Sequence, residues 1–362
     1  MEPIKILGAG PAGLTAAIVL ARAGRPVVVY ERGPNVGGRH HGDLEAFENW
    51  TTFEDVWDEF SGWGLIRNFS CTPLYTLSVF GPAFQDIGRV EDDHHPLYYW
   101  TRRGSMEGSI DHGLLAQALA AGVQVDFNRR ARPEEVDIVA SGLPRPSAFA
   151  VGYNFRTNAP DGAYICLDDT LSPQAYSYLV LWQGIGTIAA TAPVRQRGMQ
   201  NNLALLVNEF RSHVEFDFEE PEYFSASISF GLPRITGRYG RLYIGEAGGF
   251  QDLFAGFGMR MGMTSGCLAA RSILEKRNFD ELWRARIWPT QQATTVNRWA
   301  YELFGNRGYS LLVRYSWLYQ GKGRLLLYRH YHPRWYTPLL WPLAYRSMNR
   351  KYKINGGNGL SG

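Results

Sequence analysis

Six residues near the start of the chain, Gly8 to Gly13, constrain its fold more than any other feature. They read Gly-Ala-Gly-Pro-Ala-Gly and stand between an apolar stretch at Ile4–Leu7 and an apolar helical run at Leu14–Ala23. A strand, a glycine turn and a helix in this order begin the βαβ unit that binds a dinucleotide. The sequence therefore predicts an α/β fold whose first helix points its N-terminus at a pyrophosphate.

Each position of this turn has a physical role. Gly8 permits the tight turn, Gly10 lets the backbone approach the phosphates, and Gly13 lets the helix pack closely on the strand. Pro11 and Ala12 stand just before the predicted helix, whose N-terminus presents free N–H groups and the positive end of its dipole to the phosphates. We expect all five residues to line a nucleotide.

The segment after the second strand of this unit distinguishes FAD from NAD. That strand, Val27 to Tyr30, is followed by Glu31, which is placed to accept hydrogen bonds from a ribose. Arg32 follows, and then the run Gly37-Gly38-Arg39. An acid followed by paired glycines and an arginine resembles the extended fingerprint of the glutathione reductase-like flavoprotein superfamily. The resemblance implies FAD, with Arg32, Gly38 and Arg39 at its phosphates or the flavin edge; for Arg39 a surface salt bridge is the alternative.

A second stretch, about two hundred residues later, supports the same cofactor. A strand at 241–245 leads to Glu246-Ala-Gly-Gly-Phe, then to Gly256-Phe-Gly258-Met259, and then to a helix carrying Ser-Gly-Cys-Leu-Ala-Ala. This resembles the C-terminal flavin motif of geranylgeranyl reductases and aromatic hydroxylases. The resemblance implies that Glu246, in the place of the usual Asp, contacts the ribityl chain. It also implies that Gly256, Gly258 and Met259 bring a helix N-terminus to the flavin.

A third piece lies between these two. Arg103 precedes a predicted helix and strand, and Ala140-Ser141-Gly142 follows them. This order resembles the superfamily's flavin-contacting arginine, helix, strand and Asp-Gly turn over the pyrophosphate. It implies that Arg103, Ala140 and Gly142 line the cofactor, whereas Ser141 replaces the usual Asp and weakens the analogy to aromatic hydroxylases. A surface role is the alternative for Arg103.

These pieces define the predicted architecture as an FAD-binding Rossmann-like domain of the glutathione reductase type (GR2), interleaved with an α+β substrate domain. The substrate domain contains an antiparallel sheet, and helices follow at the C-terminus. We expect the FAD domain at 1–42, 101–145 and 241–277, the substrate domain at 43–100 and 146–240, and a basic aromatic helical region at 278–362. Alternating or apolar runs predict strands of the substrate domain at Ala163–Leu167, Ser177–Trp182, His213–Phe218 and Tyr223–Phe230.

Aromatic residues of the substrate domain are the candidates for substrate contact. The run from Ser172 resembles the PxxYxWxFP stretch that lines the prenyl cavity of geranylgeranyl reductases, and in it Pro173 and Tyr176 match. Tyr178 replaces the Trp, and the closing Phe-Pro is absent. Two residues apart on a strand share a face. We therefore take Tyr176, Tyr178 and Trp182 as substrate-binding candidates.

Two adjacent histidines suggest a proton donor. His40 and His41 stand beside Arg39, where an imidazole could be poised near the flavin; a polar surface role is the alternative. His41 and Tyr176 are the catalytic candidates. No His/Cys/Asp cluster has the spacing of metal ligands, so no metal site is expected.

The C-terminal region differs from the rest of the chain. Residues 281–353 hold thirteen Lys or Arg and two acids, a net charge of +11, which leaves −8 on the remainder of a chain whose overall charge is +3. Tryptophan and tyrosine are concentrated there as well. Such a segment fits peripheral membrane contact, with aromatic rings at headgroup depth and cations against anionic lipid. The alternative is a set of helices packed across the flavin domain.

Composition limits the class of protein further. A net charge of +3 does not argue for nucleic acid, and three distant cysteines fit a reduced, cytoplasmic compartment. No signal peptide is expected before the first strand, and no apolar run reaches the roughly 18 residues of a spanning helix. We therefore expect a cytoplasmic protein, with membrane association through 281–353 as the open alternative.

The resemblance to geranylgeranyl reductases implies an enzyme that reduces a C=C bond, or a similar group, of an apolar prenyl-like substrate by hydride from flavin N5. Two other classes stay open. One is oxygen activation by a flavin monooxygenase or halogenase, and the other is a flavoprotein that modifies a partner protein or exchanges electrons with it. Because the chain has no second GxGxxG unit, the electron donor is expected to be external, either NADPH or a ferredoxin-like protein.

Overall fold

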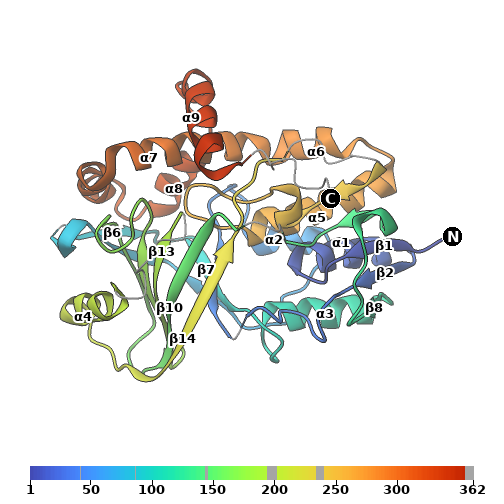
Figure 1. The fold of residues 1–362 in the computed structure, drawn as a ribbon, viewed down its shortest axis with the longest axis horizontal. Coiled ribbons are helices and arrows are strands. Elements are labelled where there is room, and N and C mark those ends of the chain that lie inside the picture. The colour runs from blue at the N-terminus through green and yellow to red at the C-terminus, as the bar shows by residue number, and fades with distance from the viewer. Residues whose placement is uncertain (41, 86, 143–145, 194–201, 234–239, 355–362) are drawn as a thin grey trace.

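The computed structural model describes all residues except 41, 86, 143–145, 194–201, 234–239 and 355–362. Figure 1 shows two sheet-containing halves side by side, with a layer of helices along one edge of both. One half contains the start of the chain and a parallel sheet. The other contains a larger, mostly antiparallel sheet. This arrangement confirms the fold class predicted from the sequence.

The parallel sheet has five strands in the order β15-β9-β1-β2-β8. Its central strand β1 pairs with β2 on one side and with β9 on the other, so the chain changes direction beside β1. In open parallel sheets such a switch point is where ligands bind, beyond the carboxyl ends of the strands. The strands are β1 (Ile4–Leu7), β2 (Val27–Tyr30), β8 (Gln124–Asp126), β9 (Ile138–Val139) and β15 (Leu242–Tyr243).

The helices beside this sheet enclose the first core. Every residue of α1 from Ala12 to Leu20 is buried, because α1 packs against the sheet as well as against α3 and α5. The helix begins at Pro11 rather than at the predicted Leu14, since proline at the first position already has a helical φ. The helices of this half are α1 (Pro11–Arg22), α2 (Val56–Gly62), α3 (Ile110–Ala120), α5 (Met259–Glu275) and α6 (Phe279–Arg286), with short 3-10 turns η2 (Pro133–Glu135) and η5 (Gly245–Gly248).

The larger sheet has seven strands in the order β14-β10-β13-β12-β11-β5-β6. All neighbours are antiparallel except β5 and β11, which run parallel. Helix α4 (Leu203–His213) covers one face, and 3-10 turn η1 (Pro82–Phe84) also packs there. The strands are β5 (Thr76–Phe80), β6 (Ile87–Glu91), β10 (Ala148–Arg156), β11 (Gly162–Cys166), β12 (Ser177–Trp182), β13 (Ile185–Ala192) and β14 (Glu219–Ile228).

One expected strand of this half is wrong. His213 ends α4, and residues 214–218 form no strand. The alternation that suggested a strand is genuine, because Val214 and Phe216 are buried and Phe218 packs against the same core. Their side chains thus enter the core from an extended segment that has no strand partner.

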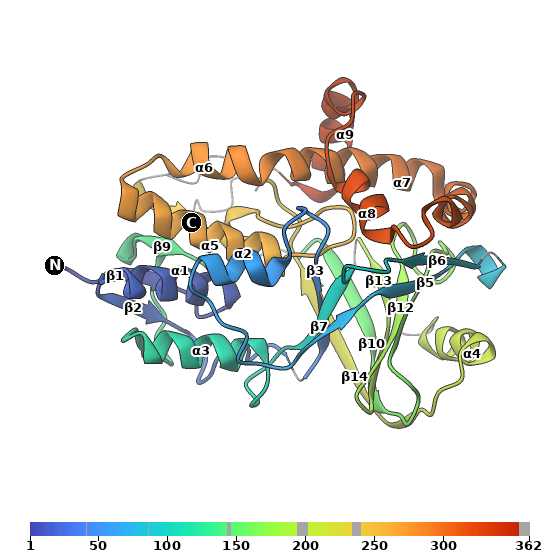
Figure 2. The same ribbon diagram turned by 180° about the vertical axis from the view of Figure 1, so that it is seen from behind.

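A three-stranded sheet, in the order β3-β7-β4, lies between the two halves (Figure 2). Residues opposite one another in an antiparallel pair share a face, so Ala46 and Trp100 point to the same side, as do Glu48 and Tyr98. That side faces the larger sheet, since Trp100 and Tyr98 belong to a core that also contains Val180 and Trp182 of β12. The strands are β3 (Leu44–Glu48), β4 (Cys71–Leu74) and β7 (Tyr98–Arg102).

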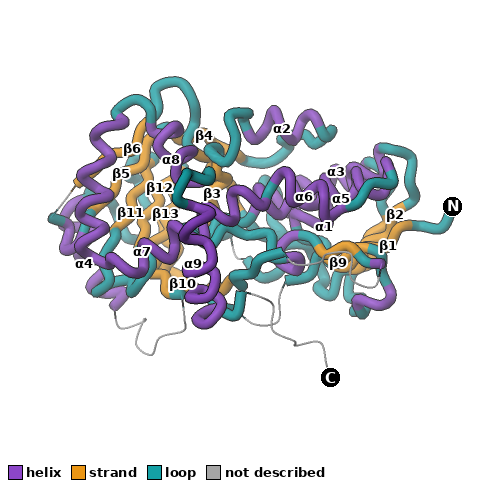
Figure 3. The backbone as a smooth tube through the Cα atoms, turned by 90° about the horizontal axis from the view of Figure 1, so that it is seen from above, coloured by secondary structure: helices purple, strands orange, loops and turns teal. Residues whose placement is uncertain are grey.

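The C-terminal helices form the layer along the edge. Figure 3 shows α7 and α9 above the larger sheet, and Figure 1 shows α9 projecting beyond α7. Helix α7 bends at Gly305, whose φ of 52° ends regular helical geometry. No helix in the described part of the chain is long and apolar enough to span a bilayer. The elements are α7 (Trp288–Tyr315), η6 (Ser316–Tyr319), α8 (Gly323–Tyr331) and α9 (Thr337–Tyr352).

Candidate cofactor and active site

The three glycines of the first turn are not equivalent. A Cβ on Gly8 would lie 2.9 Å from the carbonyl oxygen of Ala140, and a Cβ on Gly13 would lie 2.0 Å from the carbonyl oxygen of Gly8. A Cβ on Gly10 would meet no atom within 4 Å. Packing therefore requires glycine at positions 8 and 13, whereas Gly10 borders open space. That space lies at the N-terminus of α1, where no side chain caps the helix.

Glu31 is held at the end of β2 by backbone amides. Its two carboxylate oxygens accept hydrogen bonds from the N–H of Ala9 at 3.0 Å and of Gly33 at 2.8 Å. The carboxylate is thereby fixed beside the glycine turn, as a ribose contact requires. Arg32 is exposed.

Arg39, Gly142 and Glu246 come together from three separate segments. Arg39 Nη2 lies 3.9 Å from Glu246 Oε2, and a Cβ on Gly142 would lie 2.8 Å from the same oxygen. The other oxygen of Glu246 accepts a hydrogen bond from the N–H of Ser229 at 2.8 Å. The ion pair predicted as an alternative for Arg39 is thus present, but its partner is another predicted cofactor residue. Gly38 is exposed.

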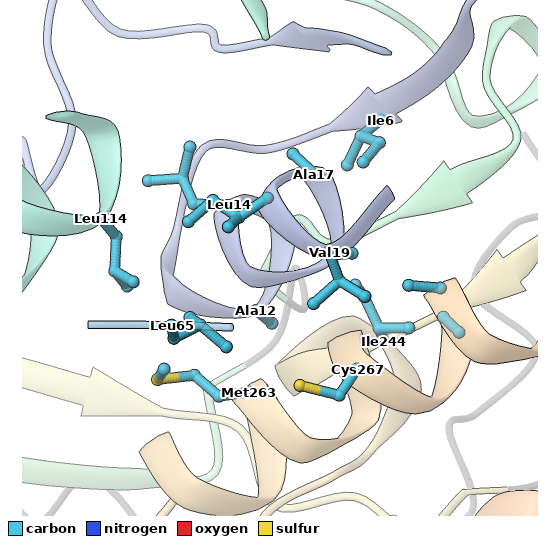
Figure 4. Close-up of a cluster of buried hydrophobic side chains, with 14 of the residues drawn as sticks. Ile6, Ala12, Leu14, Ala17, Val19, Leu65, Leu114, Ile244, Met263 and Cys267 are labelled. Carbon is cyan, nitrogen blue, oxygen red and sulfur yellow. The ribbon is translucent and has the colours of Figure 1, made fainter. Parts of the chain in front are cut away.

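Helix α5 packs closely against the glycine turn and the start of α1. The N–H of Gly245 donates to Ser265 Oγ at 2.8 Å, and a Cβ on Gly266 would lie 2.5 Å from the carbonyl oxygen of Ala12. Figure 4 shows the side chains of α1 facing Met263 and Cys267 of α5. Gly258 is the N-cap of α5 and Met259 its first residue, with Gly256 just before in a left-handed conformation. The N-termini of α1 and α5 are therefore held by one close-packed core.

We call the residues that this geometry gathers the cofactor cradle. Its members come from the ends of β1, β2, β9 and β15 and from the starts of α1 and α5. They are Gly8, Gly10, Pro11, Ala12, Gly13, Glu31, Arg39, Ala140, Gly142, Glu246, Gly256, Gly258 and Met259.

Arg103 is committed elsewhere. Its guanidinium donates to Asp111 at 2.8 Å and to Glu45 at 2.9 Å, and its side chain is only 11% exposed. Burial opposes its charge, but the carboxylates of Asp111 and Glu45 outweigh burial and raise its pKa. Burial likewise opposes ionisation of Asp111, and Arg103 more than offsets this, so the pKa of Asp111 is lowered. Arg103 thus joins β7 to β3 and α3, and its predicted flavin contact stays a prediction.

Two of the predicted substrate residues, Tyr178 and Trp182, share one face of β12, and the third, Tyr176, directly precedes that strand. The rings of Tyr176 and Tyr178 lie 6.2 Å apart, and Trp182 belongs to the same core. The Tyr176 hydroxyl donates to the carbonyl oxygen of Ala255 at 2.6 Å, which links this face to the loop before α5. Burial raises the pKa of both tyrosines, so both hydroxyls keep their protons at neutral pH.

These aromatic residues belong to a core that we call the interior layer. It lies between β12, the three-stranded sheet and helices α7 and α8. Its fully buried members are Leu44, Trp50, Val79, Val90, Leu97, Tyr98, Trp100, Ala163, Leu167, Val180, Trp182, Tyr301, Tyr309, Val313, Leu326 and Tyr331.

Glu48 was missed by the sequence reasoning. It is 1% exposed, neither of its carboxylate oxygens has a hydrogen-bond partner among the described residues, and burial raises its pKa to about 8 although Arg260 opposes this. The indole N–H groups of Trp50, Trp100 and Trp182 are also buried without partners in the described chain. The signal was available, because Glu48 continues the inward period-2 pattern of Leu44 and Ala46.

The C-terminal helices supply a wall of this layer. Tyr301 donates to the carbonyl oxygen of Ala175 at 2.6 Å, and Tyr331 donates to Asp252 at 2.8 Å. The buried guanidinium of Arg298 donates to the carbonyl oxygen of Gln174. The helices therefore pack on the body of the protein, with Arg298 and Arg324 buried in that contact and most of their other arginines exposed.

Of the two catalytic candidates, His41 lies outside the described residues. Its neighbour His40 contacts Asp43 through Nδ1 at 3.0 Å. Among the residues that the structure describes, no group of three His, Cys, Asp or Glu side chains could hold a metal ion.

Comparisons with known proteins agree with this geometry. A family model described as an NAD(P)-binding Rossmann-like domain matches residues 6–44. YgfK of Escherichia coli strain K12 is 58% identical over 37 residues, which are 10% of this chain and 4% of that relative. Sequence likeness to this curated relative is thus limited to a short segment, and the chain covers only a small part of its length.

Structural likeness extends over the whole chain. A geranylgeranyl bacteriochlorophyll reductase-like protein from Thermoplasma acidophilum superposes with a TM-score of 0.66 and 15% identity, covering 97% of this chain and 96% of that one. The flavin-dependent brominase Bmp2 superposes with a TM-score of 0.61 and 16% identity, covering 96% and 99%. The chain therefore has the same overall fold as the geranylgeranyl reductase-like protein, as the sequence analysis predicted. The likeness does not distinguish a reductase from an oxygen-activating enzyme.

Proposed function

We propose that the chain is an FAD-dependent oxidoreductase with its flavin in the cofactor cradle. The observation that carries the proposal is the open space at Gly10, because packing explains the glycines on either side and leaves this one unexplained. A pyrophosphate at the N-terminus of α1 fits that space. The shared fold with the flavin-dependent brominase Bmp2 supports the same cofactor.

The residues of the cradle divide by position. Gly8, Gly10 and Pro11 would hold the pyrophosphate, and Glu31 the adenosine ribose. Arg39, Gly142 and Glu246 would border the ribityl side. The start of α5, at Gly258 and Met259, would direct N–H groups and a positive dipole end at the flavin ring. The roles of Arg32, Gly38 and Arg103 stay predictions.

The cofactor test uses Gly10→Val. The backbone of Gly10, with φ of −78° and ψ of 174°, accepts any side chain, so the variant should fold normally. Its side chain would occupy the space of the pyrophosphate, and the purified protein should lose its yellow flavin absorbance. Gly62→Val is the matched control, because a Cβ there also meets no atom. Stoichiometric FAD in Gly10→Val would show that the cofactor lies elsewhere.

The reaction we favour is reduction of a C=C or similar bond in an apolar, prenyl-like molecule. Bound FAD supplies hydride at its N5 position. The interior layer would receive the apolar chain, with Tyr176, Tyr178 and Trp182 along one wall, and would exclude water. Glu48 holds a proton on its carboxyl at neutral pH, because its pKa is about 8. Glu48 is therefore a further candidate proton donor, in addition to the predicted Tyr176 and His41.

Oxygen activation is the second candidate, favoured by the near-complete superposition with the brominase Bmp2. The two reactions differ in what reoxidises the reduced protein. We expect anaerobic stopped-flow mixing to show reduction by an external donor, with NADPH and reduced ferredoxin tested separately. Geranylgeranyl diphosphate should then restore the oxidised spectrum and emerge with a saturated double bond. Formation of a hydroxylated or halogenated product only in the presence of oxygen, with no anaerobic turnover, would favour oxygen activation.

A further inference from the structure

Exposed apolar side chains gather on the C-terminal helices. Eighteen large hydrophobic residues of the described chain are exposed, and nine of them lie within residues 303–343. Trp335 is 81% and Trp317 64% exposed, unlike the buried Trp283. Half of the exposed apolar side chains thus come from about a ninth of the sequence. We call these nine the C-terminal apolar face: Leu303, Phe304, Leu311, Tyr315, Trp317, Leu318, Trp335, Leu339 and Leu343.

Helical spacing arranges these residues in stripes. Leu311, Tyr315 and Leu318 are separated by four and three residues, so they lie on one side of α7 and η6. Leu339 and Leu343 are four residues apart on α9, and Trp335 stands in the turn just before that helix. Residues at this spacing on a helix are neighbours on its surface rather than scattered side chains.

The opposite faces of the same helices are fixed in the protein. Tyr309 and Val313 of α7 are buried in the interior layer, and Met348 and Tyr352 of α9 are buried beside Phe230. Lys351 and Tyr352 also bond Glu302 of α7. The apolar face is thus presented outward by anchored helices. Trp341 is not part of it, because its ring packs against Trp288 at 5.2 Å.

The charged residues that follow Glu302 in the sequence all have one sign. Glu302 is the last acidic residue of the chain, and ten Lys or Arg follow it. Two of these, Arg324 and Lys351, are held in internal contacts. The exposed cations are Arg307, Arg314, Lys322, Arg329, Arg334, Arg346, Arg350 and Lys353.

We propose that the C-terminal apolar face is an interfacial membrane-binding surface whose occupant is an anionic lipid bilayer. Exposed Trp and Tyr rings suit headgroup depth, and the cations around them complement anionic lipid. A second copy of the chain is a poor occupant, since pairing this face with itself would oppose cation to cation. The proposal is independent of the proposed flavin chemistry, because the test measures binding of the protein to vesicles and does not depend on any flavin reaction.

The test is co-sedimentation with vesicles of phosphatidylcholine and phosphatidylserine at low salt. The wild-type protein should sediment, and it should stay in solution with vesicles of phosphatidylcholine alone or at high salt. The triple variant Trp335→Ser, Leu339→Ser and Leu343→Ser should partition at least about 100-fold more weakly. Its matched control changes three exposed apolar residues elsewhere, Ile66→Ser, Leu119→Ser and Leu205→Ser, and should bind as the wild type does.

A second variant tests the cations separately. Arg334→Gln with Arg346→Gln should weaken binding roughly 5-fold for each charge removed. Thermal melts should confirm that every variant is folded. Deletion from Pro333 onward is unsuitable, because it would also remove the Lys351 and Tyr352 contacts to Glu302.

Three outcomes would overturn the proposal. The folded wild-type protein could stay in solution with anionic vesicles at low salt. The control triple variant could lose binding as strongly as the C-terminal one. Light scattering could instead show a dimer that the C-terminal triple variant abolishes, with no vesicle binding, which would assign the face to a second copy.

Discussion

The cofactor cradle and the interior layer differ in whether their polar groups have hydrogen-bond partners. In the cradle, Glu31 binds two backbone amides and Glu246 binds Ser229 and Arg39. In the interior layer, the carboxyl of Glu48 and three indole N–H groups are buried without partners in the described chain. The carboxylates of Glu31 and Glu246 in the cradle thus have partners, and open space borders Gly10. The interior layer is apolar, but these polar groups within it are still able to form hydrogen bonds.

The difference teaches how each region is specified. The cradle depends on backbone approaches so close that only glycine is tolerated, and these appear as a motif in the sequence. The interior layer is assembled from segments far apart in the chain, where many apolar residues of suitable volume would serve. A buried ionisable group without a hydrogen-bond partner in the described chain, such as Glu48, is costly to stability and is therefore a candidate functional residue.

The largest effect is expected from Gly13→Ala. Its Cβ would lie 2.0 Å from the carbonyl oxygen of Gly8, and because that atom belongs to the backbone, α1 would have to move away from β1. We expect a loss of at least about 4 kcal/mol in the free energy of unfolding, seen as insoluble protein or a collapsed urea midpoint. Gly10→Val should fold normally. A stable Gly13→Ala protein would show that packing does not require glycine at position 13 any more than at position 10.

The next largest effect should come from Arg324→Met. The buried guanidinium donates to the carbonyl oxygens of Asn49 at 2.6 Å and Phe53 at 2.9 Å, and methionine would leave these acceptors without a partner. A loss of about 3 kcal/mol in urea unfolding is expected. The exposed Arg329→Met should change stability by less than about 0.5 kcal/mol. Equal losses in the two variants would mean that the carbonyl contacts contribute little.

Glu48→Gln should stabilise the protein in a pH-dependent way. The pKa of Glu48 rises from 4.5 to about 8 on folding, so the native state holds this proton more tightly than the unfolded chain. The wild-type protein must therefore lose stability as pH rises from about 4.5 to 8, whereas glutamine stays neutral. The stability gain of the variant should grow across this window to a few kcal/mol and level off above it. Thermal melts at several pH values check this, and a gain independent of pH would contradict a neutral Glu48.

The smallest effects should separate Tyr176 from Tyr178. Tyr176→Phe removes the hydrogen bond to Ala255 and should cost about 1 kcal/mol in urea unfolding. Tyr178 has no hydrogen-bond partner among the described residues, so Tyr178→Phe should leave stability unchanged. Both variants should keep FAD, and a substrate role would appear as altered turnover alone. Loss of FAD from either would place that tyrosine at the cofactor instead.

The sequence predicted the cradle better than the layer. The glycine turn, Glu31 and Glu246 follow from local rules, and the structure brings Arg39 to Glu246 across 207 residues of sequence. The commitment of Arg103 to Glu45 and Asp111 could not be foreseen, because it depends on how β3 and α3 meet β7. The strand expected at His213–Phe218 failed for a related reason. Alternation indicates which side chains are buried but does not supply a neighbouring strand.

The carbonyl contacts of Arg324 also set an order of events during synthesis. Arg324 follows Asn49 by 275 residues, and ribosomes add about 5–20 residues per second. The loop after β3 must therefore wait on the order of 15 to 50 seconds for its partner to be made. Until then its carbonyl groups stay hydrated and the core beneath it is incomplete. The N-terminal half should thus be the segment most dependent on chaperones while the chain is still being translated.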